Sequence, residues 1–378
     1  MKLRTYAAIG ALTIGLAAAL SGCTSATGSD SGSVAAAELT ADQQSCVDAV
    51  QSKVDAATAA SDLLAPETGL DLASLSGDTV WFITVSMNQF STDMADGVQA
   101  AVDAAGMKLV KYDGQGTANR FNEGIEQAVA QDAAGIILVG IDPAVVSSAL
   151  AEAEAAGIPI QNTLNGDPDD EIPTGMYGNL TSDFTIDGAT AVDWALVDGG
   201  CDVNMTVIYS SGVGVWQKMA DGAKAEMEEA CPDCTINLLD VDIAKVATDV
   251  GSQLQTALQK DPDTNYVYPV WDSAVPYVTP VLSAANSSAK IVSRDGLEAN
   301  IEMIVAGDQD MTIAMPTTGW IGWIAFDSLA RNILGDADPG YVIPTHIIDT
   351  ANVGDGSAEE VWPNYVGYED AFTEAWAK

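Results

Sequence analysis

The chain alternates short apolar runs with longer segments in which apolar residues recur every three or four positions. The clearest example begins at Val80–Val85, an apolar and β-branched run typical of a strand buried on both faces. A polar break at 86–89 follows, and beyond it the helical spacing continues to Gly106, which suits a C-terminal cap. This stretch predicts a strand, a short loop and a helix, the first half of a βαβ unit.

The same pattern repeats twice along the chain. The first series predicts the strands Lys108–Tyr112, Gly135–Val139 and one beginning at Gly157, with the helices Ala118–Asp132 and Ala144–Ala156. The second series predicts the strands Met205–Ser210, Thr235–Asp240, Tyr266–Val270 and Lys290–Ser293, with the helices Trp216–Ala230 and Thr248–Gln259. Such alternation predicts an α/β fold with two similar, doubly wound parallel-sheet lobes, whose strand ends face each other across a cleft.

The segments outside this alternation differ in composition. Residues 24–37 are rich in Ser, Gly, Thr and Ala, which favours a flexible tether. Residues 41–64 are rich in Ala and carry valines at helical spacing, so we expect a helix that packs outside the main fold. The stretch after residue 352 holds several aromatic residues, and we expect these to pack onto the body of the protein.

Composition and charge narrow the possible functions. The 378 residues are 48% apolar, which suits two folded domains of ordinary size. There are 54 acidic residues against 14 Lys and Arg, for a formal net charge of −40. Nucleic acids and anionic membrane surfaces require clustered basic residues, so neither is an expected partner. The acidity is typical of a well-solvated surface.

The N-terminus resembles a bacterial lipoprotein signal. Lys2 and Arg4 precede an apolar run at Tyr6–Leu20, and Leu20-Ser21-Gly22-Cys23 follows as a lipobox. The resemblance implies cleavage before Cys23, which would carry the lipid anchor on the outer face of the cell membrane. The expected location is therefore extracytoplasmic, with the lipid as the sole membrane contact.

Four further cysteines are Cys46, Cys201, Cys231 and Cys234. In an oxidising, exported setting we expect disulfides, with three possible connectivities. One of these closes Cys231 on Cys234 and leaves Cys46 to pair with Cys201.

No catalytic motif is present. The chain has a single histidine, His346, and lacks GxSxG, HExxH and P-loop sequences. Gly212-Val213-Gly214 follows a predicted strand, but the third glycine of a dinucleotide fingerprint is replaced by Gln217. We therefore expect no catalytic residue, no metal site and no cofactor, and we interpret the chain as a binding protein and not an enzyme.

Several sequence segments occur in an order that resembles a known family. They are MNQFSTDMADG, YDGQGTANRFNEGIEQAVAQDAAGIILVGIDP, GIPI, SSGVGVWQKMADGAKAEM, VWDSAV, SRDG and TIAMPTTGWIGWIAFDSLARNI. Together they resemble type I periplasmic solute-binding proteins, in particular the sugar-binding group related to ribose- and galactose-binding proteins. Members of this family deliver a solute to the permease of an ABC transporter.

The resemblance implies a division of the chain, because the family's chain crosses between its two lobes three times, as a three-segment hinge. The expected parts are a signal peptide at 1–22, an anchor and tether at 23–40, a helical extension at 41–77, an N-terminal lobe at 78–178 plus 316–342, a C-terminal lobe at 179–315 plus 343–352, and a tail at 353–378.

In the first lobe the resemblance places ligand-binding residues directly after two strands. Asn88 and Phe90 match the family's polar and aromatic contact positions, with Gln89 between them. Asp142 follows the GIILVG strand, where it either contacts the ligand or caps the next helix.

In the second lobe the matching positions open one helix and end two strands. They are Trp216, Gln217, Trp271, Asp272 and Asp295. Ribose-binding relatives carry an arginine at the position of Gln217, so its neutral amide argues against an anionic ligand. Two further predictions concern Arg294, which either reaches the ligand or pairs with an acid, and Trp320 of the N-terminal lobe, which, in preference to Trp323, faces the cleft.

The leading hypothesis is a monomeric, lipid-anchored substrate-binding subunit of an ABC importer. It would close its lobes on a small neutral solute such as a sugar or a polyol, held by amides, carboxylates and aromatic rings. The alternative is a sensory receptor of the same fold for a nucleoside, an autoinducer or an aromatic solute.

Overall fold

The structure is a computed structural model and describes residues 39–377, so the predicted signal peptide and Cys23 lie outside the described residues. Two β-sheets organise this part of the chain. The first has the strand order β2-β1-β3-β4-β5, and every pairing in it is parallel. Its strands are β1 (Thr79–Thr84), β2 (Lys108–Asp113), β3 (Gly135–Val139), β4 (Ile160–Thr163) and β5 (Tyr177–Leu180).

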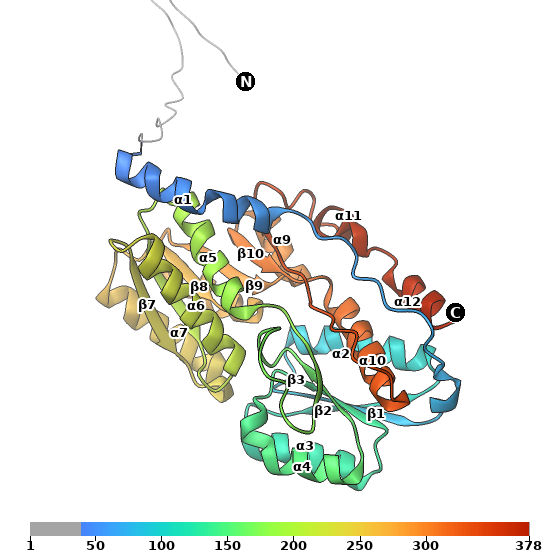
Figure 1. Cartoon of the computed structure of the whole chain (residues 1–378). Helices are drawn as coiled ribbons and strands as arrows, with labels where there is room; N and C mark the ends of the chain where they lie inside the picture. Colours follow the sequence, from blue (N-terminus) through green and yellow to red (C-terminus); the bar gives the residue numbers. More distant parts are fainter. Residues whose placement is uncertain (1–38, 378) are drawn as a thin grey trace, which may run out of the picture. The chain divides into compact units, whose positions relative to one another are not determined.

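Helices cover both faces of the first sheet, with α3 and α4 on one side and α2 and α10 on the other (Figure 1). Their bounds are α2 (Gln89–Ala104), α3 (Ala118–Ala130), α4 (Ser147–Ala156) and α10 (Thr318–Leu334). Helices α2 and α10 pack closely because glycines face each other. A Cβ on Gly97 would lie only 2.3 Å from the carbonyl oxygen of Gly319. We call this sheet with its helices the first lobe.

The second sheet has the order β11-β10-β9-β8-β6-β7 and is parallel except for the edge strand β11, which runs antiparallel to β10. Its strands are β6 (Asn204–Tyr209), β7 (Thr235–Asp240), β8 (Tyr266–Pro269), β9 (Lys290–Asp295), β10 (Met311–Ala314) and β11 (His346–Asp349). Its helices are α5 (Phe184–Asp198), α6 (Gly214–Ala230), α7 (Val246–Lys260), α8 (Val275–Ala285) and α9 (Glu298–Ala306). This is the second lobe, and the prediction of two parallel-sheet α/β lobes is confirmed.

Three segments join the two lobes. The first, 181–183, links β5 to α5, the second, 315–317, links β10 to α10, and the third, 335–345, returns from α10 to β11. The first and third segments lie side by side, because Thr181 and Val342 form a parallel bridge and the amide of Ile343 donates to the carbonyl of Thr181 at 2.8 Å.

The N-terminal helix α1 (Ala41–Thr58) packs against α5 through a buried stripe of Val47, Val50 and Val54. The helix was predicted to extend to Leu64, so the predicted C-terminal end is wrong. The chain beyond Thr58 is extended, and its carbonyls bond the C-terminal tail, where Tyr365 donates to Asp62 at 3.1 Å. These tertiary hydrogen bonds replace the helical ones that the sequence predicted.

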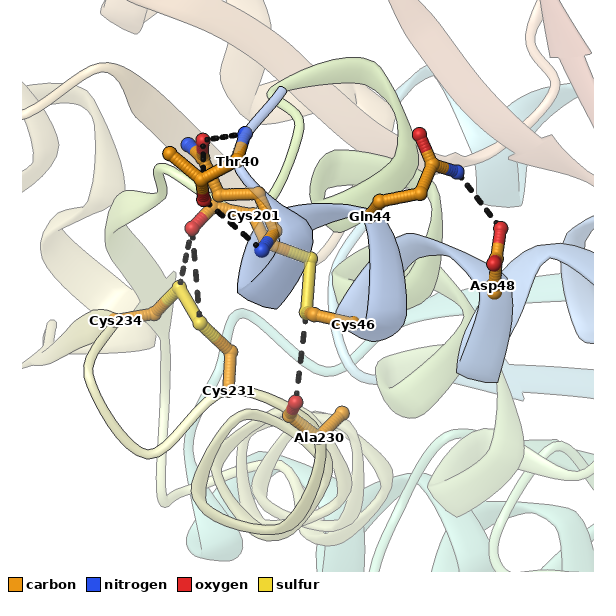
Figure 2. The surroundings of a disulfide bond; sticks show 9 residues. Thr40, Gln44, Cys46, Asp48, Cys201, Ala230, Cys231 and Cys234 are labelled. Atoms are coloured by element: carbon orange, nitrogen blue, oxygen red, sulfur yellow. Dashed lines mark hydrogen bonds between the residues drawn. A yellow bond between two sulfur atoms is a disulfide. The ribbon is translucent and has the colours of Figure 1, made fainter.

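Two disulfides lie next to each other where α1 meets the second lobe. Cys46 pairs with Cys201, and Cys231 pairs with Cys234. This is one of the three connectivities that the sequence allowed. Figure 2 shows Cys201 bonded to Cys46, with its carbonyl oxygen directed at the other disulfide, 3.5 Å from the sulfur of Cys234. The first disulfide fixes α1 to a residue 155 positions away.

The C-terminal tail packs onto the body through its aromatic residues, as predicted. It contains α11 (Ala358–Val361) and α12 (Tyr368–Trp376). The ring of Trp362 stacks on His346 at 3.9 Å, and the ring of Trp376 stacks on Trp323 at 5.3 Å. Within residues 39–377, none of the helices has the length and apolar character needed to cross a membrane.

Candidate functional site

A cavity of about 80 Å³ lies where the strand ends of the two lobes meet. In the first lobe its walls come from the end of β1 and the start of α2, and in the second lobe from the start of α6 and the ends of β8 and β9. The polar and aromatic side chains that line the cavity include those of Ser86, Asn88, Phe90, Phe184, Trp216, Trp271, Arg294 and Asp295. Ligands bind at this position in parallel α/β sheets because the loops after the strands converge there.

The first-lobe wall is formed by the loop that opens α2. Asn88 is the N-cap of this helix, and its Oδ1 accepts from the amide of Ser91 at 3.0 Å. Its Nδ2 makes no hydrogen bond with any described residue, so two donors remain for a ligand. Phe90 is half-buried in the first turn of the helix and also lines the cavity. This wall therefore offers an amide and an aromatic ring.

The second-lobe wall is dominated by two stacked indoles. The rings of Trp216 and Trp271 have their centroids 4.1 Å apart and an interplanar angle of 11°. Trp271 is buried, whereas Trp216 is half-buried at the start of α6. Aromatic rings in a cavity wall provide apolar surface, which suits the C–H face of a sugar or a planar ring.

Asp295 ends β9 and lines the cavity with a backbone φ of 138°, a conformation that non-glycine residues rarely adopt. Burial is the largest effect on its carboxyl group and raises the pKa to about 7; Arg294 lowers it and Asp272 raises it further. The group therefore lies near its titration point at neutral pH, where it can either accept or donate a hydrogen bond.

Arg294 pairs with acids, which was one of its two predicted roles. Its Nε donates to Asp187 at 3.2 Å, its Nη1 donates to Asp295 at 3.2 Å, and its Nη2 donates to Ser182. It is the single cationic side chain among the described residues of the cavity wall, and its charge is matched by the two carboxylates. The cavity thus offers no unpaired positive charge to an anionic ligand.

Asp272 was predicted to contact the ligand, but the structure places it behind the cavity wall. Its side chain is fully buried and accepts from the amides of Gly296 and Leu297, both at 2.8 Å, and from Thr312 at 3.0 Å. Its position after β8 is that of a binding residue, but its carboxylate points to the neighbouring turn. It therefore holds the 296–297 backbone that follows Asp295.

Three other predicted residues lie at the surface beside the cavity and not in its wall. Gln89 donates to Asp93 at 2.7 Å, and Gln217 donates to Asp221 at 2.9 Å. In each of these two contacts the donor and the acceptor belong to the same helix and are four residues apart. Asp142 accepts from the amide of Ala144 at 2.8 Å, so it makes the capping contact that the sequence analysis gave as an alternative.

Trp320 does not face the cavity. It is fully buried in α10, where its ring meets the edge of Tyr365 at 5.1 Å. Trp323 packs on the same tail, through Phe372 and Trp376. Both tryptophans are core residues, because the C-terminal tail covers the face of α10 that the sequence analysis assigned to the cleft.

Among the residues of the wall that were not predicted are Phe184 and Ser86. Phe184 begins α5 directly after the first joining segment, and Ser86 lies in the loop between β1 and α2. Their position after β5 and β1 is the signal that could have identified them, but β5 itself was not predicted. Among the described residues no cluster of His, Cys, Asp or Glu could hold a metal ion.

Comparison with known proteins agrees with this architecture. Residues 80–337 match the periplasmic binding protein domain family. No curated protein sequence matches the chain.

Solved structures share the fold. A carbohydrate transporter from Acidothermus cellulolyticus in complex with myo-inositol is 22% identical, with a TM-score of 0.66 over 76% of this chain and 98% of that chain. A sugar ABC transporter from Yersinia enterocolitica subsp. enterocolitica is 16% identical, with a TM-score of 0.70 over 84% and 99%. A 5-methylthioribose transporter solute-binding protein from Thermotoga lettingae is 17% identical, with a TM-score of 0.68 over 78% and 98%.

These neighbours and the two parallel-sheet lobes identify the fold as that of type I periplasmic binding proteins. Since the family match covers more than half of the sequence, the chain belongs to the periplasmic binding protein family.

Proposed function

We propose that this protein is an extracytoplasmic receptor that captures a small neutral sugar or polyol between its lobes and delivers it to the permease of an ABC importer. The observation that carries the proposal is the cavity itself, whose wall combines the stacked pair Trp216–Trp271 with the polar groups of Asn88 and Asp295. Sugars combine hydroxyl groups with an apolar face, and this wall supplies partners for both.

The charge of the site supports a neutral ligand. Arg294 is held by Asp187 and Asp295, and Gln217 provides no compensating cation. A sugar phosphate or an acid would have to break a buried ion pair to reach the guanidinium, which is costly. Neutral solutes bound by fold neighbours include myo-inositol, glycerol and allitol.

The proposal includes attachment to the membrane through a lipid on Cys23, which the lipobox supports. It also includes a monomeric receptor that binds its solute without converting it. Recovery of the added solute unchanged after long incubation with the protein would support this, whereas consumption would indicate an enzyme.

A thermal-shift screen tests the ligand class. The probes are myo-inositol, allitol, tagatose and 5-methylthioribose, with adenosine as an aromatic, nucleoside-type probe. At a ligand concentration a hundredfold above the dissociation constant, a ligand that binds only the folded state stabilises it by about 2.7 kcal/mol. A shift with any of the sugars or polyols supports the proposal, and a shift with adenosine alone overturns the carbohydrate assignment.

The alternative, a sensory receptor for a nucleoside or an aromatic solute, is favoured by one specific feature. The indole rings of Trp216 and Trp271 stack on each other with their centroids 4.1 Å apart. A purine would stack on Trp216 in the same way. The adenosine arm of the screen distinguishes the two functions.

A further inference from the structure

Arg294 connects the cavity to the part of the chain that joins the lobes. It is 2% exposed, and every nitrogen of its guanidinium group has an acceptor, Asp187, Ser182 or Asp295. The guanidinium carbon also lies 4.4 Å from the ring centre of Phe184. Because Phe184 and Asp295 both line the cavity, a bound ligand would contact two of these four neighbours.

The remaining partners lie on the joining segments. Ser182 belongs to the first segment, 181–183. Asp187 uses its second oxygen to accept from Thr345 of the third segment, at 2.9 Å. Ser182 and Thr345 are absent from the cavity wall, so they meet a ligand only through Arg294 and Asp187.

The second joining segment is attached at the same point. The amide of Met315, its first residue, donates to the carbonyl of Asp295 at 3.0 Å. All three segments are therefore bonded to one cluster, which we call the Arg294 network: Ser182, Asp187, Arg294, Asp295 and Thr345.

The charges of the network make it resist partial rearrangement. Asp187 is 2% exposed, and burial raises the pKa of its carboxyl while Arg294 and Thr345 lower it. If Arg294 moved toward a ligand alone, it would leave a buried carboxylate unpaired, which costs several kcal/mol. Movement of the arginine therefore has to take Asp187 and the joining segments with it.

We propose that Arg294 is a positioning residue that transmits occupation of the cavity to the three segments joining the lobes. This inference rests on the proposed function, since it assumes that a ligand enters the cavity. A ligand that bonds Asp295 or packs on Phe184 changes the hold on the guanidinium, and the network passes that change to Ser182 and Thr345.

The test uses variants outside the cavity. Ser182→Ala and Thr345→Val each remove one hydroxyl of the network and leave the cavity wall intact. Spin labels are attached to the full-length chain at Glu126→Cys on α3 and Gln255→Cys on α7, both exposed positions, with Cys23→Ser to prevent a third label. The distance distribution between the labels reports how firmly the lobes are held.

Without ligand, both variants are expected to give a wider distance distribution than the parent protein. The matched controls are Ser328→Ala, whose hydroxyl bonds Gln161 within the first lobe, and Thr206→Val in β6 of the second lobe. Both control side chains are buried, and both controls should match the parent. Distributions that are unchanged in Ser182→Ala and Thr345→Val, or widened equally in the controls, overturn the proposal.

A third variant, Arg294→Lys, keeps the charge but replaces three separate donor nitrogens, each of which meets a different residue, by a single nitrogen. It should widen the distribution as much as Ser182→Ala or more, and adding Thr345→Val to it should bring little further change, because both act through one network. Additive widening contradicts a shared network.

The experiment is repeated with an excess of myo-inositol and, separately, of adenosine. If neither probe alters the distribution of the parent protein, the proposed capture by lobe closure is not supported for these probes. The ligand-free comparison of the variants still decides whether the Arg294 network holds the three joining segments, so failure of this network and failure of the proposed function are distinguishable.

Discussion

Phe90 is the aromatic residue of the first-lobe wall, opposite the tryptophans of the second lobe. We predict that Phe90→Ala weakens ligand binding about tenfold to a hundredfold, because burial of a phenylalanine side chain contributes about 1.5–3 kcal/mol. The melting temperature of the ligand-free protein should change little, since Phe90 is only half-buried. Titration calorimetry with the best ligand of the screen measures the loss.

The matched control for this substitution is Tyr277→Ala, which removes an aromatic residue that is 39% exposed on α8 and lies outside the cavity wall. Equal affinities of Phe90→Ala and Tyr277→Ala would contradict a role of Phe90 in binding.

For single residues, the sequence predicted which loops and helix starts form the cavity wall better than which side chains there point into the cavity. Asn88, Phe90, Trp216, Trp271 and Asp295 were predicted from the family resemblance, after strands or at the start of a helix, and all five line the cavity. Their neighbours Gln89 and Gln217 do not. Successive residues at a helix start point about 100° apart, so adjacency along the chain cannot tell which of two side chains faces inward.

Among the elements, α1 is held to the second lobe by the disulfide from Cys46 to Cys201. We predict that Cys46→Ser with Cys201→Ser lowers the free energy of unfolding by about 2–5 kcal/mol, because a long loop gains freedom in the unfolded chain. Both cysteines are replaced, since a free thiol at Cys201 would lie beside the neighbouring disulfide. Urea denaturation followed by circular dichroism measures the change.

The second disulfide provides the comparison. Cys231 and Cys234 are separated by three positions, so their bond closes a much shorter loop. Replacing both with serine should cost less stability than removing the first disulfide. A larger loss for this pair would show that the entropy of the unfolded chain does not govern the effect.

Elements with an unbroken apolar pattern were predictable, and several short strands without one were not. Helix α6 and strand β7 carry enough residues for a clear apolar period, and β7 was predicted with its observed bounds. Strands β5, β10 and β11 were not predicted, because polar residues or Gly interrupt the apolar run in YGNL, MTIA and HIID. The end of α1 was missed because contacts with the tail, distant in sequence, determine it.

On the scale of the whole molecule, one partly exposed ion-pair cluster bridges the lobes. Lys218 of α6 lies 3.1 Å from Asp167 and 2.9 Å from Asp170, both in the loop between β4 and β5. We predict that Lys218→Gln raises the dissociation constant up to about fivefold, because pairs this exposed contribute at most about 1 kcal/mol. The effect should shrink at high salt.

Titration calorimetry at low and high ionic strength tests this bridge. Lys224→Gln, which removes an exposed pair with Glu228 within α6, is the control and should leave affinity unchanged. An effect of Lys218→Gln that does not depend on salt would contradict an ionic bridge.

The pH dependence of stability should reflect a carboxyl group buried between α1, α5 and α6. Burial is the largest effect on Asp193 and raises its pKa to about 7; Glu226 raises it further, and Lys53 lowers it. The folded protein therefore holds a proton between about pH 4 and 7 that the unfolded chain has lost, so this group's contribution to the free energy of unfolding falls as pH rises through that window.

In Asp193→Asn the contribution is gone, and the free energy of unfolding of the variant relative to that of the parent should rise with pH by up to about 1.4 kcal/mol per pH unit. Urea denaturation at several pH values measures the difference, with the exposed Asp48→Asn of α1 as the control. Curves for Asp193→Asn that run parallel to those of the parent would mean that the carboxyl group stays ionised in the folded protein, held by Lys53.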